Sequence, residues 1–74
     1  MIEIERALLS GLFQYGFESY TEIDGIIDAS CFKDDVNAIL YKCIEHIYRN
    51  KTDVKIDIPT ILSAANTLGF EQLT

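Results

Sequence analysis

The sequence of 74 residues lacks any apolar run near the length of about 20 residues that a membrane-spanning helix needs. Its first five residues, MIEIE, contain no basic segment before an apolar stretch, so no secretory signal is expected. Without such a signal, Cys31 and Cys43 are expected to be reduced thiols, with Cys43 as a small core residue. We therefore expect a cytoplasmic protein that makes no contact with a membrane.

Basic side chains are scarce, because 6 lysines and arginines stand against 12 acidic residues, which gives a formal net charge of −6. A surface of this sign repels the phosphate backbone, so we expect no direct binding of nucleic acid. The charges are also unevenly spread, since Arg6 is the only basic residue in the first 28. This asymmetry favours oriented self-association or a basic partner, although a solvated acidic surface is the simpler interpretation.

Sequence motifs of catalysis are missing as well. There is no G-x-x-x-x-G-K-[ST] loop to hold a nucleotide phosphate and no G-x-G-x-x-G turn. Residues 28–35 carry several oxygen ligands but lack the spacing and central glycine of an EF-hand loop. The neighbours Asp34 and Asp35 would point about 100° apart on a helix, so they do not form a catalytic pair. The chain is therefore not expected to be an enzyme, with no catalytic residues and no cofactor.

The only candidates for soft metal ligands are Cys31, Cys43 and His46. Cys43 and His46 would reach one ion from the same helix, but a structural zinc site needs more ligands, and Cys43 falls on an apolar stripe. A cysteine–histidine nucleophilic pair would need an orienting group that the sequence does not supply. We expect no metal site and a surface position for His46. A small enzyme or metal protein built on these three residues is the alternative.

Hydrophobic residues make up 49% of the chain, and their spacing predicts an all-α fold, a compact bundle of about four helices in a single domain. The expected helices cover approximately residues 2–15, 20–28, 34–49 and 58–68. The first has an unusually wide apolar stripe, in which Gly11 is expected to let a neighbouring helix come close. Its predicted buried face consists of Ile4, Ala7, Leu8, Gly11, Leu12 and Tyr15, widened by Leu9 and Phe13.

Local signals predict where the second and fourth helices begin. Ser19 followed by Glu22 has the spacing of a capping box, which predicts the start of the helix at 20–28. Asp57 is expected to cap the fourth helix, with Pro59 in its first turn and Gly69 after its end.

The third helix has the clearest pattern. It begins with acidic residues and ends near Arg49, which complements the helix dipole. Phe32, just before it, is expected to fill the core from the connecting turn, whereas Asn37 is expected on the polar side. The predicted apolar face is formed by Val36, Ile39, Leu40, Cys43, Ile44, Ile47 and Tyr48.

Aromatic residues gather in and around the connection between the first two helices. Aromatic side chains at such a connection are enriched in protein interfaces. Phe13 and Phe17 are more simply explained as closing one end of the bundle, whereas the polar tips of Tyr15 and Tyr20 suit an interface better. The predicted partner interface consists of Tyr15, Tyr20, Phe17, Leu9 and Phe13.

The order of these signals resembles the amino-terminal head domain of DnaB-type replicative DNA helicases. Residues 5–12 (ERALLSGL) are similar to the opening E-x-A-L-L-G-x-L run of that family, and 29–32 (ASCF) to the turn before its third helix. Residues 39–48 resemble its central helix, and 56–60 (IDIPT) its I-D-x-x-T segment, closed by Gly69. The family commonly has a histidine where this chain has Asn37. It also continues into a helical hairpin that helps to pair subunits, whereas this sequence stops at Thr74.

The resemblance implies a non-catalytic domain that acts in ring assembly and in docking of other proteins during DNA replication. The implied partners are further copies of the chain, as a dimer or hexamer collar, and a DnaG-type primase or helicase loader. One alternative is a stand-alone adaptor or inhibitor, including a phage-encoded one, that binds a replication protein. Another is an unrelated small bundle with the same helical spacing.

Overall fold

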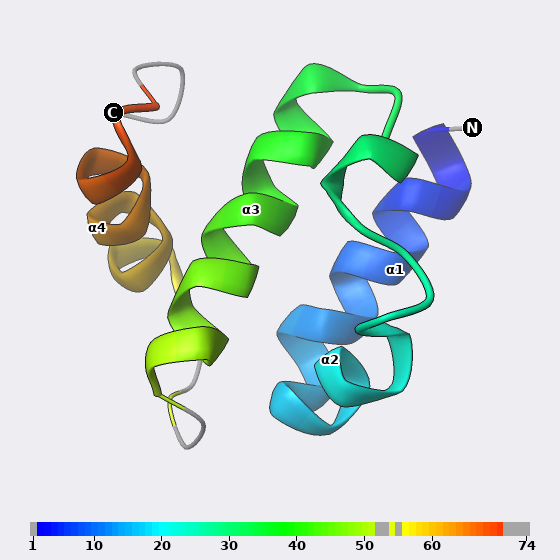
Figure 1. Cartoon of the computed structure of the whole chain (residues 1–74), viewed down its shortest axis with the longest axis horizontal. Helices are drawn as coiled ribbons and strands as arrows, with labels where there is room; N and C mark the ends of the chain where they lie inside the picture. The colour runs from blue at the N-terminus through cyan, green and yellow to red at the C-terminus, as the bar shows by residue number, and fades with distance from the viewer. Residues whose placement is uncertain (1, 52–53, 55, 71–74) are drawn as a thin grey trace.

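The chain folds into four α-helices and one short 3-10 helix (Figure 1) in this computed structural model, which describes residues 2–51, 54 and 56–70. The all-α class expected from the sequence is confirmed. The elements follow in the order α1 (Ile2–Tyr15), α2 (Phe17–Ile23), η1 (Ala29–Cys31), α3 (Asp35–Asn50) and α4 (Ile58–Leu68).

The middle of the structure is occupied by α3, with α1, α2 and η1 on one side and α4 on the other (Figure 1). Asp34 caps its start by accepting a hydrogen bond from the Asn37 N–H at 3.0 Å, and Arg49 lies in its last turn. Because neighbours cover α3 on two sides, it supplies much of the core. Its buried residues are Asn37, Ile39, Tyr41, Cys43, Ile44, Ile47 and Tyr48.

The ends of α4 are formed by the residues that the sequence predicted. Asp57 caps the first turn, since its carboxylate accepts a hydrogen bond from the Thr60 N–H at 2.9 Å, and Pro59 lies in that turn. Gly69 ends the helix in the left-handed conformation (φ 81°), which lets the Phe70 N–H reach the Ala65 carbonyl at 2.9 Å.

Aromatic rings fill the core between α2 and α3. The ring centroids of Phe17 and Tyr48 are 5.4 Å apart, and those of Tyr20 and Tyr48 are also 5.4 Å apart. Phe32 packs on Tyr41 at 5.0 Å and is buried, so the expectation that it fills the core from the connecting turn is confirmed.

The prediction for the second helix was wrong in its position and its cap. α2 begins at Phe17, directly after Gly16, and no side chain caps its start. Gly16 has φ 70° and ψ −139°, a conformation that glycine adopts without strain, so the chain ends α1 and starts α2 within one residue. Gly25 (φ 90°) lies in the turn that follows, which ends α2 before residue 28. The early start allows Tyr20 to be buried against α3.

The buried face of α1 differs from the predicted one. Glu5, Leu9 and Leu12 are buried, whereas Ile4 and Tyr15 are exposed. A Cβ atom added at Gly11 would meet nothing within 4 Å, so the expected close packing at this glycine is absent among the described residues. The apolar stripe of α1 is wider than the single side that its neighbours cover, and its other half therefore faces outward.

Further exposed apolar residues include Val36, which was expected on the apolar face of the third helix, and Ile26 and Ile58. Ile26 lies in the turn after α2, outside any helix, and its side chain is therefore not held against the bundle. Val36 and Ile58 lie in the first turns of α3 and α4.

A hydrogen-bonded carboxylate fixes how α1 lies against α3. Glu5 accepts hydrogen bonds from the backbone N–H of Lys33 at 2.8 Å and of Asp34 at 3.2 Å, and from the Asn37 side chain at 3.2 Å. These donors, led by the Lys33 N–H, hold the pKa of the Glu5 carboxyl below its usual value. Asn37 is therefore buried, and its predicted place on the polar side of the helix was wrong.

Candidate functional site

An apolar strip runs along one edge of the outward side of α1. Ile4, Leu8, Gly11 and Tyr15 follow one another at helical spacing, and we call these four residues the α1 surface. Ile4 is 57% exposed and Tyr15 is 64% exposed, while Leu8 is half-buried. Beside Ile4 and Leu8 lies a small hollow of about 290 Å³, bordered by Ile27, Cys31 and Phe32. The α1 surface is thus an apolar strip with a hollow beside it.

Only part of the predicted partner interface lies on the outside. Tyr15 and Phe13 are exposed, and their role in binding stays a prediction. Phe17 is half-buried against Tyr48. Leu9 and Tyr20 are each only 4% exposed, because α1 turns Leu9 toward α3 and the early start of α2 turns Tyr20 inward. Burial leaves these two side chains almost no surface for a partner, and their role in binding stays a prediction.

All four residues of the α1 surface were assigned to the buried face of the first helix by sequence reasoning, and Tyr15 was placed in the partner interface as well. The signal that would have found them is the width of the apolar stripe, which exceeds what one neighbouring helix covers. The buried acid Glu5 gives the direction of the core, but its hydrogen-bond partners Lys33 and Asp34 are distant in sequence.

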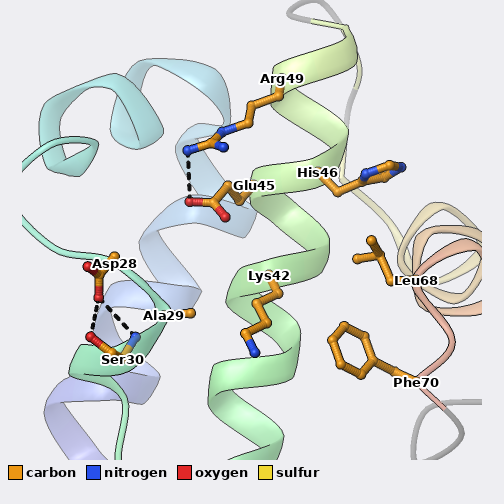
Figure 2. A pocket seen from close by; sticks show the side chains of 9 residues that line it. All are labelled: Asp28, Ala29, Ser30, Lys42, Glu45, His46, Arg49, Leu68 and Phe70. Carbon is orange, nitrogen blue, oxygen red and sulfur yellow. Dashed lines mark hydrogen bonds and ion pairs between the residues drawn. The ribbon is translucent and has the colours of Figure 1, made fainter.

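A second surface is an open hollow of about 480 Å³ in front of α3 (Figure 2). Glu45 and Arg49 form an ion pair at 3.3 Å within it. Lys42 also lines this hollow, and its Nζ lies 5.7 Å from the centre of the Phe70 ring. The hollow is lined by Asp28, Ala29 and Ser30 from the η1 segment, by Lys42, Glu45, His46 and Arg49 from α3, and by Leu68 and Phe70.

A neighbouring hollow of about 450 Å³ lies between α3 and α4, and His46 borders both. On the α3 side it is bordered by Asn50 and Lys51 as well. Its α4 side carries the hydroxyl groups of Thr60, Ser63 and Thr67, and Val54 and Pro59 close its end.

The buried titratable groups are poorly suited to catalysis. Burial raises the pKa of the Cys43 thiol, and it raises the pKa of Tyr41 to about 12, so neither group ionises readily near neutral pH. Cys31 is exposed, whereas Cys43 is fully buried in α3, and His46 lies at the hollows. Residues 2–51, 54 and 56–70 contain no group of three or more side chains placed to hold a metal ion.

A sequence model of the DnaB-like helicase N-terminal domain family matches residues 1–73, and the chain belongs to this family. The family is a non-catalytic domain of a helicase. No curated protein and no solved structure matches the chain significantly. In the described part of the chain, each helix is too short or too polar to cross a membrane.

Proposed function

We propose that this domain acts in the ring assembly of a DnaB-like replicative helicase and in the docking of primase or a helicase loader. The family match supports a helicase domain that works without chemistry of its own. The observation that carries the assembly role is the α1 surface, because a helix of this composition leaves apolar side chains in water unless a partner covers them.

A second copy of the chain is the partner that the α1 surface suits. Gly11 has open space in front of it and Leu8 is half-buried, so another helix can approach α1 closely between Ile4 and Tyr15. In a twofold contact each apolar side chain is used twice, once from each copy. Weak contacts of this kind become effective in a ring, where one contact raises the effective concentration for the next.

The assembly role is tested by the double variant Ile4→Ser/Tyr15→Ser, with the molar mass measured by sedimentation over a range of concentrations. Removing two exposed apolar groups from each copy is expected to weaken self-association by about tenfold or more. The matched control is Ile26→Ser/Val36→Ser, which removes two exposed apolar side chains elsewhere. Equal self-association of both variants and the wild type would contradict this use of α1.

The docking role has its own experiment. The domain is mixed with the carboxy-terminal domain of the cognate primase, and the size of the complex is measured by light scattering. A joint species is expected, because docking places the primase on the helicase ring. If the two proteins elute separately at concentrations near 100 µM, a Kd of about 1 mM or weaker follows and primase docking by this domain is excluded.

A further inference from the structure

The small hollow beside the α1 surface has the size and lining of a site for an aromatic ring. An apolar cavity of about 150 Å³ is enough to hold a benzene ring, and this hollow measures about 290 Å³. Most of its border is apolar, and one carboxyl group adds a polar part, so a ring with a polar tip suits it. The border consists of Ile4, Glu5 and Leu8 from α1 and of Ile27, Cys31 and Phe32 from the segment before α3.

A matching ring lies at the other end of the same strip. Tyr15 is the last residue of α1 and is 64% exposed, so its phenol ring is largely in water. The hollow lies beside the first half of α1, at Ile4 and Leu8. Gly11 stands between the two, four residues before Tyr15 and four residues after Ala7. The chain therefore carries a projecting ring and a hollow on opposite sides of Gly11.

A twofold axis at Gly11 would bring this ring and this hollow together. When two α1 helices lie antiparallel, positions at equal distances on either side of the axis face each other, so Tyr15 of one copy lies opposite Ala7 of the other. Ala7 is exposed and small, and it belongs to the helical turn between Ile4 and Leu8 that borders the hollow. A Cβ atom at Gly11 would meet nothing within 4 Å, which lets the second helix come close where the two helices cross.

We propose that the hollow beside α1 binds the Tyr15 side chain of a second copy of this chain. Each copy then fills the hollow of the other, and both rings leave water in one contact. An unrelated partner helix would use the ring or the hollow only if it carried the complementary feature, whereas a second copy supplies both. The inference deepens the proposed assembly function and rests on it, because it names the side chain that is inserted and the place that receives it.

This contact is expected to be weak in the isolated chain. The strip from Ile4 to Tyr15 spans eleven helical steps, or about 16 Å along a helix about 10 Å wide. A contact of this extent lies at the low end of interface sizes, below about 1,200 Å² in total. Two copies that each carry a net charge of −6 also repel each other, so added salt is expected to strengthen their association.

The test follows the alkylation of Cys31, which borders the hollow and is exposed. The whole chain reacts with excess iodoacetamide at concentrations of about 10 µM and about 1 mM, and mass spectrometry measures the rate at Cys31. In the wild type, Cys31 is expected to react about twofold or more slowly at the higher concentration, because the Tyr15 ring of a second copy then covers the thiol. The buried Cys43 serves as the internal reference for a folded chain.

Substitutions of Tyr15 separate the ring from its hydroxyl group. Tyr15→Ser is expected to abolish the protection of Cys31, whereas Tyr15→Phe is expected to retain most of it, because the ring fills the hollow. The matched control is Phe13→Ser, which removes an exposed aromatic side chain of the same helix outside the α1 surface. Cys31 in this control is expected to be protected as in the wild type.

Fluorescence gives a second measurement of the same event. The sequence contains no tryptophan, so Tyr15→Trp introduces a single indole. Its emission is expected to shift to shorter wavelength as the protein concentration rises, because the indole moves from water into the hollow. Phe13→Trp is the matched control and is expected to show no such shift.

Sedimentation of the wild type at the same concentrations separates the two possible failures. If the chain self-associates while Cys31 reacts equally fast at both concentrations, the hollow stays open and the proposal is wrong, although the assembly role stands. If the chain remains monomeric at about 1 mM, both are wrong. Undiminished protection of Cys31 in Tyr15→Ser, or equal emission shifts of the two tryptophan variants, would show that another part of the second copy covers the thiol.

Discussion

The side-chain amide of Asn37 donates a hydrogen bond of 3.2 Å to the Glu5 carboxylate, which joins the beginning of α1 to the beginning of α3. The same carboxylate accepts from the backbone of Lys33 and Asp34, so one buried acid secures the chain segment before α3. This arrangement decides which side of α1 faces inward, and therefore which side forms the α1 surface.

The Glu5 carboxylate is expected to make stability depend on pH in the acid range. The pKa of Glu5 in the folded state lies below the ordinary value of 4.5, so its contribution is present above about pH 4.5 and is lost as the pH falls through the lowered pKa. Glu5→Gln is expected to be less stable than the wild type at pH 7, with the difference shrinking below pH 4.5. Urea unfolding at pH 7 and pH 3 measures this, and a difference that is the same at both values would contradict it.

Replacing Gly11 in α1 and replacing Gly16 between α1 and α2 by alanine are expected to change the free energy of unfolding in opposite directions. Gly16→Ala forces a Cβ into a conformation with φ 70° and to within 3.3 Å of the Tyr48 hydroxyl oxygen. We expect a loss of about 1–3 kcal/mol in the free energy of unfolding. Gly11→Ala, inside α1 with open space around it, is expected to gain about 0.5–1 kcal/mol. Thermal unfolding of both variants provides the comparison, and destabilisation by Gly11→Ala would show that a neighbour packs there.

Buried tyrosines are expected to lower stability at alkaline pH. Burial raises the pKa of Tyr41 from 10.0 to about 12, so the unfolded chain loses this proton at a lower pH than the folded chain does. The contribution of protonated Tyr41 to the free energy of unfolding is therefore fully present below pH 10, and it is lost as the pH rises toward 12. Tyr41→Phe keeps the packing on Phe32 and is expected to show a smaller alkaline loss, with Tyr20 and Tyr48 supplying the remainder. Denaturant titrations at pH 8 and pH 11 check this, and identical losses would refute it.

The two cysteines are expected to differ in reactivity. Cys31 is exposed, whereas Cys43 is fully buried on α3 and burial raises the pKa of its thiol. Under native conditions at pH 8, iodoacetamide is expected to alkylate Cys31 and to leave Cys43 unmodified until urea unfolds the chain. Mass spectrometry of the digested protein locates the label. Equal labelling rates would mean that the core around α3 opens readily.

The sequence predicted α3 and α4 well because their signals are local. Asp34, Asp57 and Gly69 each act on a helix end within a few residues, so spacing alone was sufficient. The start of α2 was missed because it depends on the burial of Tyr20 against α3, a tertiary effect that outweighs the local capping signal at Ser19.

The orientation of α1 was harder to predict for the same reason. Its apolar stripe allows several orientations of nearly equal burial, and the one adopted is set by the bonds from Glu5 to residues 28, 29 and 32 positions away. Such partners have no periodic signature. The candidate site shares this difficulty. Leu9, Phe13 and Tyr15 were each placed both on the buried face of the helix and in the partner interface, and the burial of Tyr20 was not foreseen.

Helix α4 has its main contact with α3, on the opposite flank from α1 and α2 (Figure 1). Among the described residues, the attachment of α4 therefore depends mainly on this one interface. A molecule that contacted Lys51 together with Thr60 or Thr67 would bridge the interface between α3 and α4. Slower hydrogen–deuterium exchange in α4 would then show that such a molecule is bound, at a site separate from the α1 surface.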